Sequence, residues 1–290
     1  MTRLLHLSDT HATATGLDED GVDAVRALEQ VLHDARHVPE LDAVVVSGDV
    51  ADDGSVAGCV AVRERVGRFA AERGIPQIYS TGNHDDRANF ASALGSGHLG
   101  PDGSECGTLL DESAGARAAV SEAGGLRVVT LDSLVPGKTF GAIDDDQLRW
   151  LDGLLATPAA NGTVLVFHHP PLVVPYLPYV KDVVLQNIDD LADVVRGRDV
   201  RAVLTGHLHF QLSGSLAGVP VWVTPGVVTR IDTTSAPHLV RGVRGASCTV
   251  IDVDESGSLT CCLLTARDTR ANEQVYVYNP LTGEDVDEPV

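Results

Sequence analysis

The sequence predicts an α/β fold built around a partly parallel sheet. Short β-branched runs alternate with helical patterns through the first 80 residues, an order typical of βαβ units. The run over residues 43–46 is an unbroken Ala-Val-Val-Val, as expected for a parallel strand covered on both faces. A chain of 290 residues, 43% of them hydrophobic, can also bury a sizeable core. With no internal repeat or long linker in view, we expect one domain over residues 1–268, followed by a C-terminal strand and acidic tail over residues 269–290.

The first half of the fold follows from apolar periodicity. Apolar residues at helical spacing, such as Val25, Leu28 and Val31, predict amphipathic helices between strands. The elements expected in order are a strand over 4–7, a helix over 20–36, a strand over 43–46, a helix over 56–73 and a strand over 74–80.

The later elements are less regular. Residues 92–107 are rich in Gly and Ser and predict a loop in which His98 is a surface residue. Next come an expected strand over 126–131, a helix over 146–155, a strand over 163–167, a helix over 188–196 and a strand over 202–204. Short strands over 210–216, 219–223, 247–252 and 259–264 then look antiparallel. Residues 225–245 form a connection that could border a pocket, and the acidic segment 283–288 is expected to be mobile.

Charge, cysteine content and hydropathy exclude several classes of function. A net charge of -20 argues against a nucleic-acid polymer as partner, and an anionic substrate needs a local positive source. Five cysteines in no regular framework predict reduced thiols in a cytosolic protein. No signal-peptide pattern opens the chain, and no apolar run approaches the roughly 20 residues of a membrane span. We therefore expect a soluble, cytoplasmic protein without membrane contact, and pairing of C-terminal strands in a homodimer is one arrangement that the sequence allows.

Five short polar runs each follow a predicted strand, where open α/β sheets keep their sites. The candidate ligands in these runs are Asp9, His11, Asp49, Asn83, His168, His207 and His209. His169 is equivalent to His168 on composition alone. Carboxylates, imidazoles and an amide oxygen without a thiolate suit Mn, Fe, Zn or Co better than a structural zinc site. Seven ligands are too many for one ion, so we expect two divalent ions that share one bridging carboxylate.

The same runs resemble the full signature of the calcineurin-like metallophosphoesterases. The matching motifs are Asp9-x-His11, Gly48-Asp49-x-x-Asp52-x-Gly54, Gly82-Asn83-His84-Asp85, His168-His169-Pro170 and Gly206-His207-x-His209. Segments 5–11, 82–87, 147–151 and 200–209 are further similar to bacterial class III cyclic nucleotide phosphodiesterases.

This resemblance implies a four-layer αββα sandwich of two mixed sheets flanked by helices, with the metals at the sheet edges. It implies that Asp9, His11 and His209 hold one ion and that Asp49 bridges to the other. The second ion would then be held by Asn83, His168 and His207, where the family pattern selects His168 over His169. Iron and manganese are the expected metals. The purple acid phosphatase branch carries a tyrosine where this chain has Asp52, so no charge-transfer ferric site is expected.

The expected reaction is hydrolysis of 3',5'-cyclic nucleotides (cAMP, and cGMP as a second substrate) to 5'-monophosphates by a metal-bridging hydroxide. Asp49, Asn83 and His84 are the expected catalytic residues, with His84 protonating the leaving alkoxide. Either Asp85 or Asp52 could orient His84.

Other possibilities remain open from the sequence. Asp132 could orient a site histidine or cap a turn, and Tyr176 and Tyr179, in a proline-rich loop, could stack on a base or pack against the domain. The alternative function is a broader phosphodiesterase or phosphomonoesterase acting on 2',3'-cyclic nucleotides, glycerophosphodiesters or nucleotides. A non-catalytic scaffold is disfavoured because every ligand position is filled.

Overall fold

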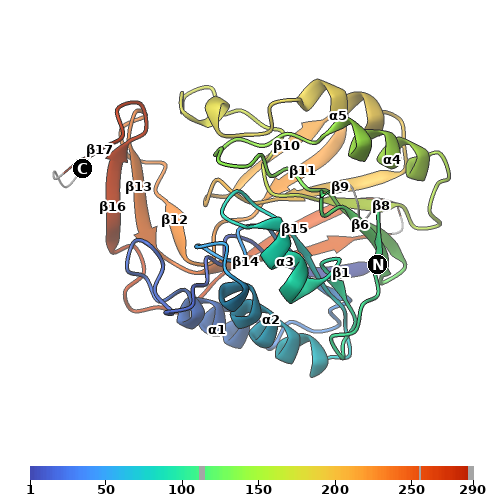
Figure 1. The fold of residues 1–290 in the computed structure, drawn as a ribbon, viewed down its shortest axis with the longest axis horizontal. Helices are drawn as coiled ribbons and strands as arrows, with labels where there is room; N and C mark the ends of the chain where they lie inside the picture. The colour runs from blue at the N-terminus through green and yellow to red at the C-terminus, as the bar shows by residue number, and fades with distance from the viewer. Residues whose placement is uncertain (111–114, 255, 287–290) are drawn as a thin grey trace.

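Two stacked mixed β-sheets form the core of the computed structural model, which describes residues 1–110, 115–254 and 256–286 (Figure 1). The first sheet has six strands in the order β15 (Leu259–Thr265), β14 (Ser247–Val253), β1 (Thr2–Leu7), β2 (Ala43–Ser47), β3 (Gln77–Ser80) and β4 (His98–Leu99). The second has seven, in the order β10 (Leu212–Leu216), β11 (Val219–Val223), β9 (Val200–Thr205), β8 (Thr163–Val166), β7 (Leu126–Thr130), β6 (Ala119–Ala123) and β5 (Thr108–Leu109).

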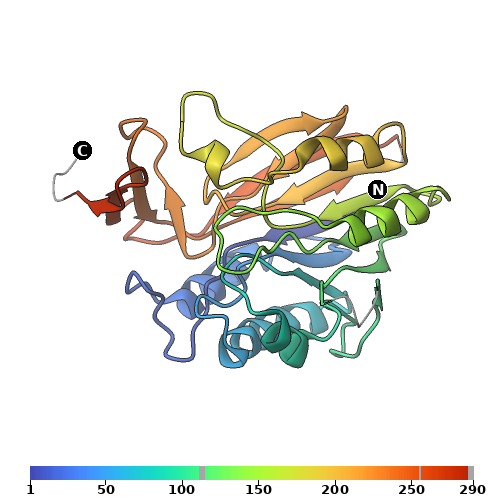
Figure 2. The ribbon, with the colours of Figure 1, turned by 45° about the horizontal axis from the view of Figure 1, so that its top comes forward.

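Helices cover the outer face of each sheet (Figures 1 and 2). Those on the first sheet are α1 (Ala24–Ala35), α2 (Val56–Ala71) and α3 (Arg87–Leu94), and those on the second are α4 (Asp145–Leu155) and α5 (Ile188–Val195). Alternation along β2 explains the layering, because Val44 packs into the core under α1 and α2 whereas Val45 packs between the two sheets. The expected four-layer αββα sandwich of two mixed sheets is therefore confirmed.

The central strands of both sheets are parallel, as the βαβ pattern predicts. β1, β2 and β3 run in one direction in the first sheet, and β7, β8 and β9 are parallel in the second. Their carboxyl ends meet at a common edge, where the Nδ1 of His168, after β8, donates to the carbonyl of Ser47 at the end of β2 (2.8 Å). This edge positions the site.

Polar caps determine where the helices begin. The side chains of Asp23, Ser55, Asp86 and Asp144 each accept a hydrogen bond from a backbone N–H in the first turn of α1, α2, α3 and α4. α3 was not anticipated from its short and weakly periodic sequence, and the Asp86 cap is the local signal that identifies its start.

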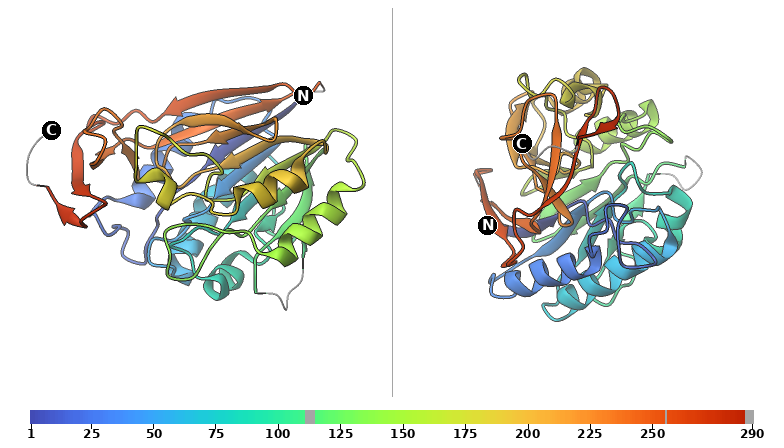
Figure 3. Two further views of the ribbon diagram at one scale, coloured as in Figure 1. Left: turned by 90° about the horizontal axis from the view of Figure 1, so that it is seen from above. Right: turned by 90° about the vertical axis from the view of Figure 1, so that its left-hand side faces the viewer.

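A third, smaller sheet lies at one end of the sandwich (Figures 1 and 3). It has the order β12 (Thr229–Ile231), β13 (Val240–Arg244), β16 (Gln274–Asn279) and β17 (Glu284–Asp285). Residues 225–245, expected to be a plain connection, thus contain two strands. The acidic segment, expected to be mobile from residue 283, instead pairs with β16 through Glu284 and Asp285, and its residues 287 and 288 lie outside the described residues.

Two further expectations differ from the structure. β11 is antiparallel to β10 but parallel to β9, because the β10–β11 hairpin folds back and inserts β11 beside β9.

His98 is buried in β4, where Ser121 Oγ (2.6 Å) and Thr130 Oγ1 (2.9 Å) contact its two ring nitrogens. These hydroxyl partners make burial of the imidazole tolerable, so His98 is a core residue, not a surface one.

The five cysteines are free, as the sequence predicts. Among the described residues, no helix combines the length and apolar character needed to cross a membrane. The cytoplasmic location, the domain boundary at residue 268 and the homodimer stay predictions.

Candidate metal centre

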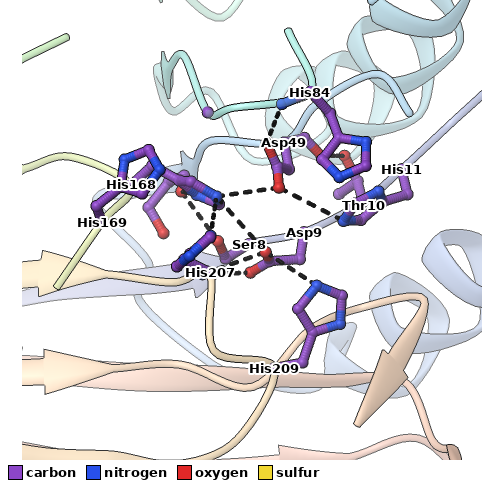
Figure 4. Close-up of polar contacts among 12 residues, drawn as sticks. Ser8, Asp9, Thr10, His11, Asp49, His84, His168, His169, His207 and His209 are labelled. Atoms are coloured by element: carbon purple, nitrogen blue, oxygen red, sulfur yellow. Dashed lines mark hydrogen bonds and ion pairs between the residues drawn. The ribbon is translucent and has the colours of Figure 1, made fainter. Parts of the chain in front are cut away.

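The structure gathers predicted ligands at the edge where the parallel strands end, and Figure 4 shows Asp9, His11, Asp49, His168, His207 and His209 there. Asp9 and His11 follow β1, and Asp49 follows β2 in the same sheet. Asn83 comes after β3, His168 after β8, and His207 and His209 after β9. Both sheets therefore contribute side chains to one small volume.

The backbone at these positions is unusual. Asp9, His11, Asp49, His207 and His209 all have positive φ, between 43° and 70°. They are five of the eight non-glycine residues with positive φ in the described part of the chain. This conformation costs on the order of 1 kcal/mol per residue outside glycine. Its concentration at five candidate ligands indicates that side-chain direction at this edge outweighs backbone preference.

Three glycines leave room for the site. A Cβ built on Gly48 would come within 2.5 Å of His168 Nδ1, and one on Gly82 would overlap the carboxylate of Asp49. A Cβ on Gly206 would overlap Ser8 and approach Asp9 Oδ2 at 2.6 Å. Glycine is therefore required where these loops pass the carboxylates and imidazole.

One group of ligand atoms is made by Asp9, His11 and His209, whose donor atoms lie within 4.8 Å of one another. His209 Nε2 is 3.2 Å from Asp9 Oδ1. His11 Nε2 is 3.6 Å from Asp49 Oδ2, so Asp49 adjoins this group. This is the set that the family resemblance assigns to one ion.

A second group surrounds His168. Its Nε2 lies 3.0 Å from Asp49 Oδ2 and 3.2 Å from His207 Nδ1. His169 also falls in this group, with its donor atom within 4.8 Å of those of His168 and His207. Asp49 thus touches both groups, the position that a bridging carboxylate requires. The individual ligand assignments remain predictions.

Outer partners fix which imidazole nitrogen faces the site. The Nδ1 of His168 donates to the Ser47 carbonyl, and His209 Nδ1 lies 3.1 Å from the Thr229 carbonyl. His11 Nδ1 lies 2.7 Å from Asp52 Oδ1. A proton held on Nδ1 leaves Nε2 with its lone pair, so these three rings are oriented as metal-ligating histidines usually are.

The donor set fits divalent cations. Among the described residues, His11 Nε2 and Asn83 Oδ1 are buried and have no hydrogen-bond partner, and an orphaned buried polar atom is costly. His207 Nδ1 and His168 Nε2 converge at 3.2 Å. Two cations, one beside His11 and the other beside the remaining three atoms, would satisfy these groups, and nitrogen and oxygen donors suit Mn, Fe, Zn or Co.

The pKa values of the neighbouring His168 and His207 are shifted in opposite directions. Burial alone would lower the pKa of His168, but the charge and hydrogen bond of Asp49 outweigh it and raise that pKa to about 9. For His207, burial and then the charge of His168 lower the pKa to about 3. Burial would raise the pKa of Asp49, yet His168 and His84 hold it well below its usual range. The site therefore keeps a charged carboxylate beside a neutral imidazole.

His84 is held by Asp52 and not by Asp85. Its Nδ1 is 2.9 Å from the Asp52 carbonyl and 3.4 Å from Asp52 Oδ1. Asp85 instead accepts backbone N–H bonds from Val50, Ala51 and Gly82. Of the two residues proposed to orient His84, the structure places Asp52 there, and Asp52 also contacts His11.

Of the two roles considered for Asp132, the structure supports the cap of a turn. Its Oδ1 accepts the N–H of Leu134, two residues on (3.0 Å), and it contacts no site histidine among the described residues. Its carboxylate also accepts from the Arg87 guanidinium (2.6 Å) and the Arg117 N–H (2.8 Å). Tyr176 is 59% exposed, whereas Tyr179 is buried and lines the cavity beside the site. The two tyrosines therefore differ in environment although they lie in the same loop.

A cavity of about 380 Å³ opens over these groups. Its lining includes the candidate site residues His11, Asp49, Asn83, His84, His207 and His209. Apolar residues such as Val183, Phe210 and Ile231 line it too, as do the acidic residues Asp18, Glu19, Asp20, Asp52 and Asp285. The expectation that residues 225–245 could border a pocket agrees with the lining, since Thr229, Ile231 and Val240 belong to it. The sequence did not predict that Tyr276 and Tyr278 line it too, because they come from a distant strand.

Comparison with known proteins places the chain among phosphoesterases. The family model described as calcineurin-like phosphoesterase matches residues 2–211. A probable cyclic nucleotide phosphodiesterase of Rhodococcus erythropolis is 40% identical over 256 residues, covering 86% of this chain and 79% of that protein. A cAMP/cGMP dual specificity phosphodiesterase of Mycobacterium tuberculosis is 38% identical over 259 residues, covering 86% and 75%. Among solved structures, TT1561 of Thermus thermophilus aligns with a TM-score of 0.49 at 14% identity, over 90% of this chain and 98% of that one.

Proposed function

The chain belongs to the calcineurin-like phosphoesterase family, and we propose that it hydrolyses 3',5'-cyclic nucleotides to nucleoside 5'-monophosphates. Two relatives, 40% and 38% identical over most of both chains, are named as cyclic nucleotide phosphodiesterases. The observation that carries the proposal is the cavity of about 380 Å³, which joins the candidate metal ligands to an apolar wall. That volume is in the range of small-molecule sites, and its two kinds of lining, metal ligands and apolar side chains, suit the phosphate and the nucleoside of one substrate.

The proposed cofactor is a pair of divalent ions, with iron and manganese the preferred candidates. Asp9, His11 and His209 would hold one ion and Asp49 would bridge to the second. Asn83, His168 and His207 would complete the second site. Such ions supply Lewis acidity and lower the pKa of bound water toward about 7. The charge also provides the local positive source that an anionic diester needs in a protein of net charge -20.

His84 is the proposed general acid. Its side chain lines the cavity and is 29% exposed, so it can reach a bound ester. Burial would lower its pKa, but the charge of Asp49 and the hydrogen bond to the Asp52 carbonyl raise it. With Nδ1–H donated to that carbonyl, Nε2–H of the imidazolium is free to give its proton to the leaving alkoxide.

Two backbone N–H groups hold the carboxylates of this site in place. The His84 N–H donates to Asp49 Oδ1 (2.9 Å), which ties the acid to the proposed bridging carboxylate. The His207 N–H donates to Asp9 Oδ2 (3.0 Å) across the two sheets. Fixed geometry of this kind lowers the reorganisation needed as charge develops on the phosphoryl oxygens.

The proposal is tested by turnover of metal-reconstituted protein on four substrates, with products separated by chromatography. The substrates are 3',5'-cyclic AMP, 2',3'-cyclic AMP, bis-p-nitrophenyl phosphate and AMP. Conversion of the 3',5' ring to AMP, with AMP left intact, supports the proposal. Equal or faster turnover of the other esters would instead support the broader phosphoesterase. An identically purified Asp49→Asn variant controls for contaminating activity.

A further inference from the structure

One wall of the cavity comes from a part of the chain outside residues 2–211, which the family model matches. The third sheet and the turn in it supply Thr229, Ile231, Val240, Tyr276, Tyr278, Pro280 and Asp285. The candidate metal ligands all precede residue 211. The chemistry and this wall are therefore encoded by separate parts of the sequence.

Strand register explains why these side chains share a face. In the antiparallel ladder, Ile231 is opposite Gly242, and Gly242 is opposite Tyr276. The next row of partners that share this face is Val240, Tyr278 and Asp285. Directly opposed residues point to the same side of a sheet, and residues two apart on a strand do so too. One whole face of the third sheet is thus turned toward the cavity.

Gly242 lets the Tyr276 ring lie across the sheet. A Cβ at Gly242 would collide with the ring carbons of Tyr276. The ring therefore covers bare backbone, and any side chain at position 242 would push it toward the cavity. The Tyr278 ring lies beside it, with centroids 5.9 Å apart and planes at 46°. The two rings are therefore neighbours on one face of the third sheet.

Further apolar cavity residues come from earlier in the chain. Tyr179 and Val183 lie in the segment after His169, and Phe210 directly follows His209. Tyr179 and Phe210 belong to one buried cluster, against which Tyr276 and Tyr278 pack. Aromatic side chains from separate parts of the chain therefore meet at this cavity, which Asp18, Glu19 and Asp20 also line.

β12 joins the third sheet to the candidate metal ligands. Thr229, the first residue of β12, contacts His209 Nδ1 through its carbonyl (3.1 Å) and its Oγ1 (3.0 Å). A ligand whose phosphate lies near His209 and His84 would share the cavity with the aromatic side chains of the third sheet.

We infer that the third sheet is the base-binding wall of the enzyme, with Tyr276 and Tyr278 as the surface on which the nucleobase stacks. This inference rests on the proposed function, since it assumes a nucleotide substrate. Aromatic side chains stack on any base through its π face, so the wall favours nucleotides over diesters without a base. It makes Tyr276 and Tyr278 specificity-determining residues, not catalytic ones.

The test compares substrates with and without a base. In Tyr276→Leu and Tyr278→Leu, kcat and KM are measured for 3',5'-cyclic AMP and for methyl riboside 3',5'-cyclic phosphate, which lacks the base. Because stacking on one aromatic side chain changes base affinity by about 5- to 150-fold, the ratio of the two kcat/KM values should fall by that factor. The loss should appear in KM for cyclic AMP.

Tyr276→Phe keeps the ring and should keep the ratio. Tyr176→Leu removes an exposed tyrosine that does not line the cavity and serves as the matched control. Thermal melting and metal content verify that each variant is folded and loaded. An unchanged ratio in both leucine variants, or an equal loss on both substrates, would overturn the inference.

A binding measurement separates this inference from the proposed function. The affinities of AMP and ribose 5-phosphate are measured by calorimetry for the same variants. If the wild-type protein fails to hydrolyse cyclic AMP, the proposed function fails. The wall is still supported if wild type prefers AMP over ribose 5-phosphate and the leucine variants lose that preference, and it is refuted if they retain it.

Discussion

Histidine illustrates how much one residue type depends on its surroundings. His168 and His207 face each other at 3.2 Å, yet the pKa of the first is raised to about 9 and that of the second is lowered to about 3. The difference arises because Asp49 lies beside His168 and opposes its burial. His98 is also buried, but hydroxyls are its partners and burial lowers its pKa to about 3. A carboxylate neighbour thus marks the histidine that gains a charge.

The raised pKa of His168 predicts pH-dependent metal affinity. Since the folded value of about 9 exceeds the ordinary 6.5, protonated His168 stabilises the metal-free protein fully below pH 6.5, and this stabilisation is lost as pH rises through 9. A cation held by His168, as proposed, displaces that proton, so Mn²⁺ affinity should rise between pH 6.5 and 9 and binding should release protons. Calorimetry in buffers of different ionisation enthalpy measures the protons released, and affinity independent of pH over that interval would contradict the prediction.

Replacement of His84 by alanine should lower kcat without releasing metal. A general acid typically contributes about 10²- to 10⁴-fold in rate, and we propose His84 for this role because it lines the cavity and contacts Asp52. The loss should be smaller for p-nitrophenyl esters, whose leaving group needs little protonation. His33→Ala, an exposed position on α1, is the control.

Steady-state kinetics and elemental analysis of the bound metal together test the His84→Ala prediction. Metal loss in His84→Ala, with unchanged activity per metal-loaded enzyme, would show that His84 acts on the ions and not on the leaving group.

At the scale of secondary structure, the candidate ligands lie at strand ends. An ion pair between side chains holds one of the neighbouring loops in position. α3 follows the site loop, and its first residue, Arg87, reaches across to Asp132 beyond the end of β7. The guanidinium makes two bonds to the carboxylate, Nε to Oδ2 at 2.6 Å and Nη2 to Oδ1 at 3.1 Å. The side chain of Asp132 is fully buried. This pair therefore ties the helix after the Asn83 loop to the second sheet.

Removal of Arg87 should destabilise the fold. Arg87→Ala leaves the buried Asp132 carboxylate without its cation, and such changes cost about 3 kcal/mol. Arg149→Ala removes an exposed partner of Asp146 and should change the free energy of unfolding by less than about 1 kcal/mol. Urea unfolding monitored by circular dichroism measures both. Equal midpoints for the two variants would show that the Arg87–Asp132 pair contributes little.

In the molecule as a whole, the candidate metal centre joins the two sheets. Asp9, His11 and Asp49 belong to the first sheet, whereas His168 and His207 come from the second. Within this edge, imidazoles and carboxylates from both sheets converge with little room for other groups. Bound cations would therefore stabilise the packing of one sheet on the other in addition to serving the reaction.

Metal removal should accordingly lower both stability and activity. Binding at 100 times Kd stabilises the folded state by about 2.7 kcal/mol, so dialysis against EDTA should lower Tm by several degrees. Added Mn²⁺ should restore Tm and turnover. Asp49→Asn, which lacks the proposed bridging carboxylate, should show a much smaller response. A Tm unaffected by EDTA in the wild-type protein would contradict the prediction.

Local sequence patterns were enough to predict the partly parallel α/β sheet and the set of residues at its common edge, and the motif resemblance added the αββα layering. β-branched runs define strands, and each candidate ligand follows a strand end closely in the chain, so the parallel order of the strands brings the ligands together. Only the folded chain reveals which partner each group has, such as Asp52 for His84 and Arg87 for Asp132. The same holds for Tyr276 and Tyr278, which line the cavity. These contacts join residues far apart in the chain, and their register depends on packing that no local pattern encodes.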